Sequence, residues 1–188
     1  MWSFFKRKSH DEQPEPATAP APRQESAKPM NWYVVAVNLS GGAEAQLEHL
    51  VTPLAPAEYA NGLPPEAIAG RLDQPPNGPP NDGSAKPIDP EGFARNRAFH
   101  QFLHHVIATH GPTLPDLIEG ARQQGDGSMA VIDLRTPEGI WGNVPPDDII
   151  GLFSVQAGKL GEYHANDDYC AFTANGFMQL EPSLAAAY

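Results

Sequence analysis

The chain has 188 residues, which is enough for one domain with a hydrophobic core but not comfortably for two. Its formal net charge is −11, and an acidic body repels phosphate backbones, so we expect no nucleic-acid partner. Cys170 is the one cysteine, which excludes a disulfide within the chain and favours a buried, unreactive thiol.

The first thirty residues form a separate zone. They carry five basic and four acidic residues, whereas residues 31–188 carry seven basic and nineteen acidic residues, a net charge of −12. Three aromatic residues stand beside three cations at the start: Trp2, Phe4, Phe5, Lys6, Arg7 and Lys8. A stretch rich in proline and alanine follows. The composition predicts a disordered basic and aromatic tail with a linker over residues 1–30, ahead of a single acidic domain over residues 31–188.

Three interpretations of this tail stay open. Aromatic and basic side chains together favour weak contact with an anionic membrane surface. The same residues could dock into a groove of a partner protein, or the terminus could have no role. The aromatic residues precede the basic ones, which is the reverse of a secretory signal, and no apolar run approaches the ~20 residues of a membrane span. We therefore expect a cytoplasmic protein that is membrane-peripheral if the tail binds lipid.

The domain begins with a β-branched and aromatic run, residues 31–39, which predicts a buried strand. Leu47, Leu50 and Val51 have the spacing of one helix face, so a helix is expected next. Residues 53–90 then contain ten prolines and four glycines, which predicts a long loop. One helical segment is expected inside it, at residues 61–72.

Two helices are predicted in the middle of the chain. The first begins with Asp89 as N-cap and Pro90 as first helical residue, and ends at Gly111. Its apolar stripe consists of Phe99, Phe102, Leu103, Val106 and Ile107, with His110 on the same stripe near the end. The second begins with a capping box from Thr113 to Asp116 and ends at Gly125.

Short strands and turns fill the rest of the chain. Strands are expected at residues 128–136, 149–155, 160–165, 169–174 and 177–180, and Asn175-Gly176 is a hairpin signal. Early helices followed by a run of strands predict an α+β fold. We expect a mainly antiparallel sheet of about five to six strands with two to three helices packed on one face.

Histidines in the first helix are candidate metal ligands. On a helical wheel, His100 and His104 share one flank, whereas His105 lies on the opposite flank. Two histidines one turn apart can hold one divalent metal such as zinc, but zinc needs three or four ligands. His164, Asp133, Asp147 and Asp167 are available as further ligands, and no spacing selects among them.

Asp133 and Arg135 are the candidate catalytic residues. They alternate along a predicted strand, so their side chains point to the same side, and a carboxylate in an apolar strand needs a partner. They could form a polar site, pair with each other, or pair with the long loop. The pairs Asp147-Asp148 and Asp167-Asp168 are interpreted as turn residues, because adjacent acids on a strand diverge.

These observations favour a non-enzymatic adaptor or regulatory domain that binds a protein partner, with the tail as a second contact and no cofactor. No complete catalytic motif is present. A small metal-dependent enzyme at His100 and His104 is the alternative. A regulatory domain that binds a small ligand under the 53–90 loop is a third, weaker option.

Overall fold

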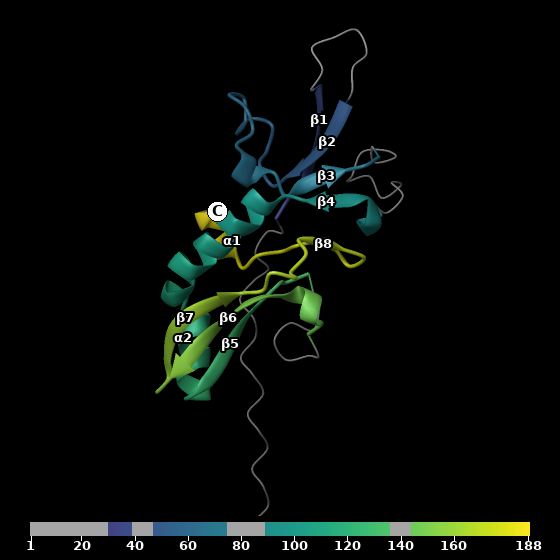
Figure 1. Ribbon diagram of the computed structural model, residues 1–188. Helices are drawn as coiled ribbons and strands as arrows, with labels where there is room; N and C mark the ends of the chain where they lie inside the picture. The colour runs from purple at the N-terminus through teal and green to yellow at the C-terminus, as the bar shows by residue number, and fades with distance from the viewer. Residues whose placement is uncertain (1–29, 39–46, 75–88, 136–143) are drawn as a thin grey trace, which may run out of the picture.

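The computed structural model describes residues 30–38, 47–74, 89–135 and 144–188 (Figure 1). They form an α+β fold whose strands pair antiparallel in every sheet, which confirms the predicted class. The strands are divided among three sheets of four, three and two strands, where one sheet of five to six was expected. No helix in these ranges has the length and apolar character needed to cross a membrane.

The four-stranded sheet contains β1 (Tyr33–Asn38), β2 (Leu47–Thr52), β3 (Gly70–Leu72) and β4 (Phe93–Arg95) in sequence order. The strand predicted at its start is confirmed, but it is half-buried to exposed and not buried as expected. The helix expected around Leu47, Leu50 and Val51 is wrong, because this segment pairs with β1 along its whole length, from Leu47 opposite Asn38 to Thr52 opposite Tyr33. The spacing of the apolar residues did not distinguish a helix from a strand, and pairing with the neighbouring strand determines that this segment is a strand.

Part of the predicted loop is regular structure. The helical segment expected at residues 61–72 is reduced to the 3₁₀ turn η1 (Pro65–Ala67), and β3 follows at Gly70. Asn96 holds this region, because its side-chain amide donates to the carbonyls of Pro65 and Ile68 at 2.7 and 2.8 Å.

Two α-helices connect the sheets. α1 (Arg97–His110) begins later than predicted: Asp89 and Pro90 start the 3₁₀ turn η2 (Pro90–Gly92), β4 follows, and Asn96 is the true N-cap. Four of the five predicted stripe residues, Phe99, Leu103, Val106 and Ile107, are buried, whereas Phe102 is half-buried and His110 is exposed at the helix end. Burying each of these apolar side chains contributes roughly 1.5–3 kcal/mol.

α2 (Pro115–Gln124) follows the 3₁₀ turn η3 (Gly111–Thr113) and ends at Gly125 as predicted. The expected capping box is wrong, because the Thr113 hydroxyl donates to the His110 carbonyl instead and Leu114 occupies the N-cap position.

The three-stranded sheet lies below α1 in Figure 1 and is covered by α2 on one side. Its order is β5 (Gly127–Ile132), β6 (Ile149–Gln156) and β7 (Lys159–Ala165), with the 3₁₀ turn η5 (Pro146–Asp148) leading into β6. Gly151 is the third of the eight residues of β6, and a Cβ at this position would overlap the Tyr163 ring of β7. The glycine thus lets Tyr163 lie flat against the sheet.

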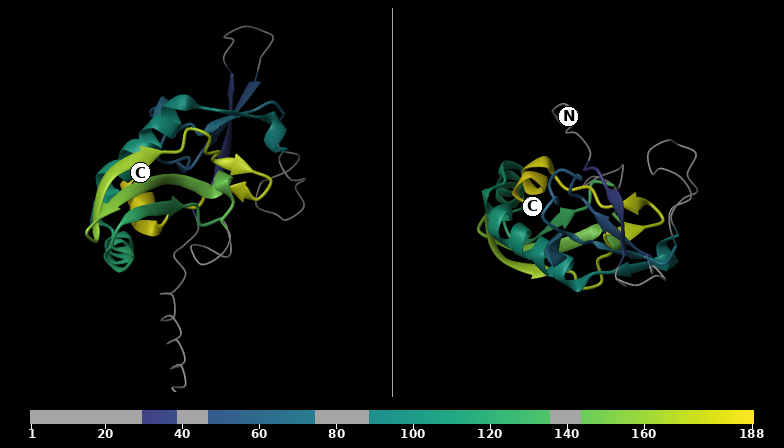
Figure 2. Two further views of the ribbon diagram at one scale, coloured as in Figure 1. Left: turned by 60° about the horizontal axis from the view of Figure 1, so that its bottom comes forward. Right: turned by 90° about the horizontal axis from the view of Figure 1, so that it is seen from above.

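The C-terminal segment closes the core. β8 (Phe172–Thr173) and β9 (Gly176–Phe177) form a hairpin where one was predicted, but its turn is Ala174-Asn175, one residue before the expected Asn175-Gly176, and the strands are shorter than expected. α3 (Pro182–Ala187) packs on α1. One buried cluster unites these elements: Ala69, Phe99, Leu103, Ile107, Leu114, Val131, Ile150, Phe153, Tyr169, Ala171, Met178, Leu180 and Leu184. Figure 2 shows α1 between the two larger sheets, so the core lies where the sheets meet this helix.

Candidate functional site

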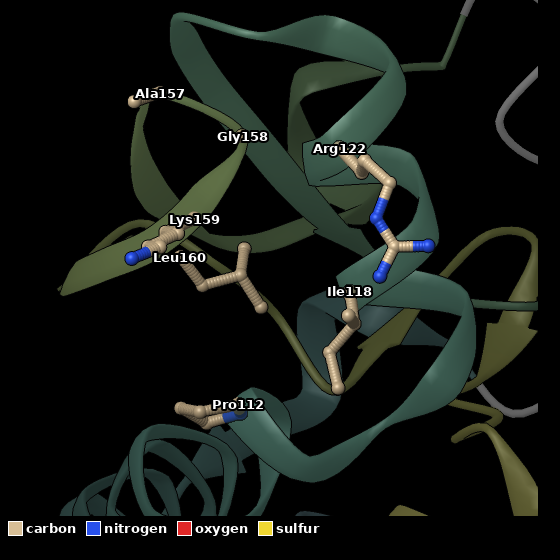
Figure 3. Close-up of a pocket in the computed structure, with 7 residues that line it drawn as sticks. All are labelled: Pro112, Ile118, Arg122, Ala157, Gly158, Lys159 and Leu160. Carbon is tan, nitrogen blue, oxygen red and sulfur yellow. The ribbon is translucent and has the colours of Figure 1, made fainter.

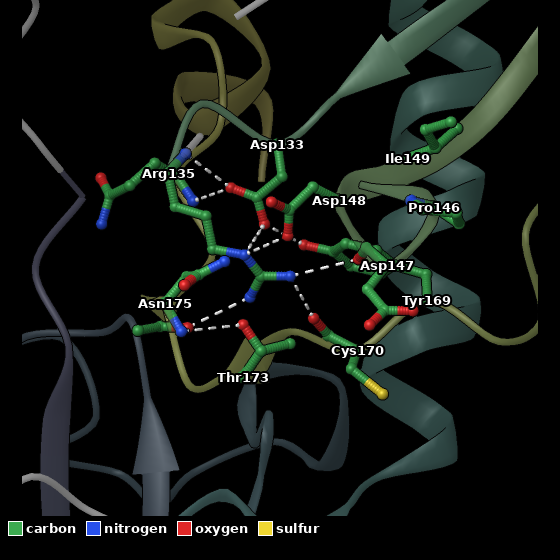
Figure 4. A network of polar contacts seen from close by, with 12 residues as sticks. Asp133, Arg135, Pro146, Asp147, Asp148, Ile149, Tyr169, Cys170, Thr173 and Asn175 are labelled. Atoms are coloured by element: carbon green, nitrogen blue, oxygen red, sulfur yellow. Dashed lines mark hydrogen bonds and ion pairs between the residues drawn. The ribbon is translucent and has the colours of Figure 1, made fainter. Parts of the chain in front are cut away.

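Arg135, a predicted site residue, lies just after β5 in a buried polar network (Figure 4). Its side chain is 2% exposed and its Nε is 2.7 Å from Oδ1 of Asp148 and 3.3 Å from Oδ2 of Asp133. Its terminal nitrogens donate to backbone carbonyls: Gly176, Asp147 and Cys170 at 2.9–3.2 Å. The guanidinium therefore holds the ends of four separate segments together.

Asp133 is fully buried and its oxygens are also engaged. Oδ1 accepts the backbone N–H groups of Arg135 and Gln179 at 3.0 and 2.8 Å, and Oδ2 accepts the Tyr169 hydroxyl at 2.6 Å. Burial and the neighbouring Asp133 raise the pKa of Tyr169 well above its usual value, so the phenol stays protonated as a donor. Of the alternatives that the sequence left open, the pairing of Asp133 with Arg135 is the one observed, inside the protein.

Two members of this network were absent from the predicted site. Asp148 is 1% exposed, and Tyr169 is fully buried. The sequence interpretation placed Asp148 in a turn, and it does end η5, but its carboxylate turns inward onto Arg135. No sequence signal pointed to Asp148 or Tyr169, because one arginine already balances the charge of one aspartate and only the fold brings the other two side chains to it. These four side chains bind one another, which suits a structural role better than catalysis.

His100 and His104 lie together on one face of α1, as predicted. Each is partly or largely buried, and the charge of His104 acts on His100. Nδ1 of His104 shares a hydrogen bond of 2.9 Å with the Tyr163 hydroxyl of β7. Burial lowers the pKa of His104, while the nearby Asp167 opposes that change.

His100 has a more confined environment. It is 9% exposed, its ring lies beside Phe99 and Tyr169, and Nε2 has no hydrogen-bond partner among the described residues. Burial, then the charges of His104 and Arg95, lower its pKa from 6.5 to about 4. The ring is therefore neutral at pH 7.

The other side chains proposed as metal ligands do not complete a site with His100 and His104. Asp167 is close enough to His104 to act on its pKa, whereas His164 stands opposite Leu152 on the exposed side of β7. In the part of the chain that the structure describes, no three His, Cys, Asp or Glu side chains gather so that they could hold a metal ion. Cys170 is half-buried, where a buried thiol was expected. Its carbonyl accepts from Arg135 and its thiol donates to the Asp168 carbonyl.

A surface hollow of about 390 Å³ lies between α2 and the turn that joins β6 to β7 (Figure 3). Pro112, Ile118 and Leu160 supply its apolar wall, and Ile118 is 38% exposed although it is a large aliphatic residue. Figure 3 shows Arg122 above Ile118 on α2, whereas the side chain of Lys159 points away from this space. None of these residues stood out in the sequence, because α2 and β7 are brought together only by the fold.

The turn beside the hollow is strained. Ala157 has a φ of 49° and Gly158 a φ of 71°, which makes a two-residue hairpin turn with alanine where Asn or Gly is usual. The turn is held on the end of α2: Ala157 N–H donates to the Asp126 carboxylate at 2.9 Å, and Gly158 N–H to the Gly125 carbonyl at 2.6 Å. The position of the turn relative to α2 is therefore fixed.

The tail candidates Trp2, Phe4, Phe5, Lys6, Arg7 and Lys8 lie outside the described residues. Comparison with protein-family models, curated proteins and solved structures found no match. A function for this chain must therefore be inferred from its own residues.

Proposed function

We propose that this chain is a non-enzymatic protein-interaction domain, an adaptor or regulator, whose binding site is the hollow between α2 and the β6–β7 turn. The observation that carries the proposal is the apolar wall of Pro112, Ile118 and Leu160, of which the first two are exposed and the third is half-buried. A concave site with an apolar wall and few polar groups is the usual form of a binding pocket. The buried charges of Asp133 and Arg135 support the same view, since they bind each other.

Affinity capture with the full chain tests this function. Ile118→Ala should reduce the recovery of a partner protein at least about fivefold, because an interface anchor contributes ~1 kcal/mol or more. Leu152→Ala is the matched control, since Leu152 is also 38% exposed but lies on β6 outside the hollow. Equal loss with both variants, or no loss with either, would contradict the proposal.

We further propose that the tail provides a second contact, with an anionic membrane surface or with the same partner. Three aromatics beside three cations give weak, reversible binding, since each basic residue contributes ~1 kcal/mol near such a surface. Full-length chain should sediment with vesicles rich in phosphatidylserine, and replacing Trp2, Phe4 and Phe5 by alanine should abolish this. Sedimentation that is unchanged in the triple variant would remove the membrane from the proposal.

A zinc-dependent enzyme at His100 and His104 is the second candidate, favoured by the unpartnered Nε2 of His100 among the described residues. Its weakness is that Nδ1 of His104 already binds Tyr163. Metal analysis of untagged protein distinguishes it: one zinc per chain, lost in His100→Ala, would favour the enzyme over the interaction domain.

A further inference from the structure

We infer that two copies of this chain join through antiparallel pairing of their β1 strands, with Val35 on the two-fold axis, so that two four-stranded sheets become one continuous sheet. The inference concerns a different surface from the hollow and does not depend on the proposed interaction site. Three features of β1 support it: its position at the edge of the sheet, the absence of groups that oppose pairing, and the fit of the strand to its own copy.

β1 is an outer strand of the four-stranded sheet. Within the described ranges it pairs along its whole length with β2 and with no other strand. Backbone N–H and C=O groups of an outer strand point away from the sheet at the spacing of a further strand, so the group that satisfies them is another extended backbone. Figure 1 shows β1 in the upper part of the molecule and α2 in the lower part, so pairing at this edge leaves the hollow accessible.

The other outer strands of the two larger sheets carry features that oppose pairing with another chain. β4 has three residues and includes Arg95. The pairing of β5 and of β7 with β6 is interrupted by register shifts, and β7 includes Lys159 and Glu162. β1 has six residues without a charge or a proline, and its register with β2 is regular. Short strands, charges and bulges are the common protection of a sheet edge, so β1 is, of these four strands, the one open to a further strand.

The side chains of β1 fit those of a second copy. A two-fold axis perpendicular to the sheet keeps the same face of both copies on the same side. With Val35 opposite Val35 of the second copy, Tyr33 stands opposite Val37 on the same face. Val34 stands opposite Ala36 on the other face. Aromatic and β-branched residues in such cross-strand pairs stabilise a sheet, and all of these residues except Ala36 are only half-buried in a single copy.

Charge favours a second copy over a basic peptide as the occupant. The chain has a net charge of −11 and attracts basic peptides over a long range, but β1 offers them no carboxylate. Glu48, which stands opposite Val37 on β2, is already paired with Arg71 at 3.1 Å. Two copies therefore repel each other through their net charge but not at the paired strands. Salt screens that repulsion, so it should strengthen the dimer, whereas it would weaken binding of a basic peptide.

Sedimentation equilibrium of the full chain tests the dimer. We expect a reversible monomer–dimer equilibrium that shifts toward the dimer between roughly 0.05 and 0.5 M sodium chloride. Ala36→Lys should raise the dissociation constant at least about fivefold, because it places two lysines near each other across the axis. Ala94→Lys is the matched control: it makes the same charge change at an exposed position of β4, the other edge of the sheet, and should change the constant less than about twofold.

Disulfide cross-linking tests the register, in a Cys170→Ser background that removes the one native cysteine. Val35→Cys would stand opposite itself, with about 5 Å between Cα atoms, which a disulfide can span. Val37→Cys lies on the same face but about 13 Å from its copy, because four residues of strand separate them. In a glutathione redox buffer, Val35→Cys should form a covalent dimer at least about tenfold faster than Val37→Cys.

Four results would overturn the inference. These are a chain that stays monomeric up to its solubility limit, equal effects of Ala36→Lys and Ala94→Lys, equal cross-linking at the two cysteine positions, and a dimer that salt weakens. Capture of a partner that depends on Ile118 concerns another surface, so the proposed interaction function stands or falls separately.

Discussion

Arg135 connects segments that are far apart in the chain, and its removal should affect stability more than any surface charge. Arg135→Met would leave Asp133 and Asp148 buried without their cation. Breaking a buried ion pair on one side costs roughly 3–5 kcal/mol, so we expect a loss of that size in the free energy of unfolding. Urea denaturation measures it.

The matched control is Arg71→Met, whose partner Glu48 lies at the surface. An exposed pair contributes ~0–1 kcal/mol, so this variant should stay close to the native protein. A loss of similar size in both variants would mean that the buried network has no special role.

His100 should make the protein sensitive to mild acid. Its pKa is lowered to about 4 in the folded chain, against 6.5 unfolded, so the unfolded state binds a proton first. The contribution of the neutral His100 ring to the free energy of unfolding is complete above pH 6.5 and is lost as the pH falls from 6.5 toward 4. Each pKa unit corresponds to ~1.4 kcal/mol, and partial solvent screening reduces the total to about 2 kcal/mol at pH 4.5.

Urea denaturation between pH 7 and 4.5 checks this effect. His100→Gln cannot gain a proton, so its stability should fall less over this range than that of the native chain. His105→Gln, at an exposed position of the same helix, should follow the native curve. Identical pH dependence in all three proteins would assign the acid sensitivity to other groups.

At the scale of elements, the turn of the β6–β7 hairpin is strained at Ala157, and a substitution there should stabilise the protein. Ala157→Asn should raise the free energy of unfolding by ~0.5–1 kcal/mol, because Asn tolerates positive φ in such a turn. Gly158→Ala should act in the opposite direction, since its φ is also positive and a Cβ would lie 3.2 Å from Cα of Arg122. Thermal unfolding of the two variants measures both shifts. Destabilisation by Asn would show that the turn is not strained.

Several elements with local signals were predicted well, although the start of α1 and the capping box of α2 were not, and β2, which depends on a distant partner, was wrong. The apolar stripe of α1, the end of α2 at Gly125 and, to within one residue, the hairpin near Asn175 follow from spacing and turn chemistry within a few residues. β2 was predicted as a helix because its pairing with β1 spans residues that no local pattern relates. The same limit applied to the site: Asp133 and Arg135 were found, but Asp148 and Tyr169 were identified only through the fold.

At the scale of the whole molecule, one core predicts one unfolding transition. The buried cluster includes Ala69 beside β3, Phe99 of α1 and Phe153 of β6, so the two larger sheets share the same apolar interior. Trp32 stacks on Phe177 and donates to the Met178 carbonyl, which makes its fluorescence a reporter of the closed core. In a variant with Trp2→Phe and Trp141→Phe, fluorescence and circular dichroism should give coincident urea curves. Two separated midpoints would indicate that the sheets unfold independently.

The buried network also provides a fingerprint by which distant relatives could be recognised. Asp133, Arg135, Asp148 and Tyr169 depend on one another, so a substitution at one position leaves an unsatisfied group at another. Replacement of the whole set by apolar residues is tolerated far better than loss of one member. Divergent sequences with this fold should therefore keep the four residues together or exchange them together. A search weighted toward that combination has a physical basis even where surface residues have changed beyond recognition.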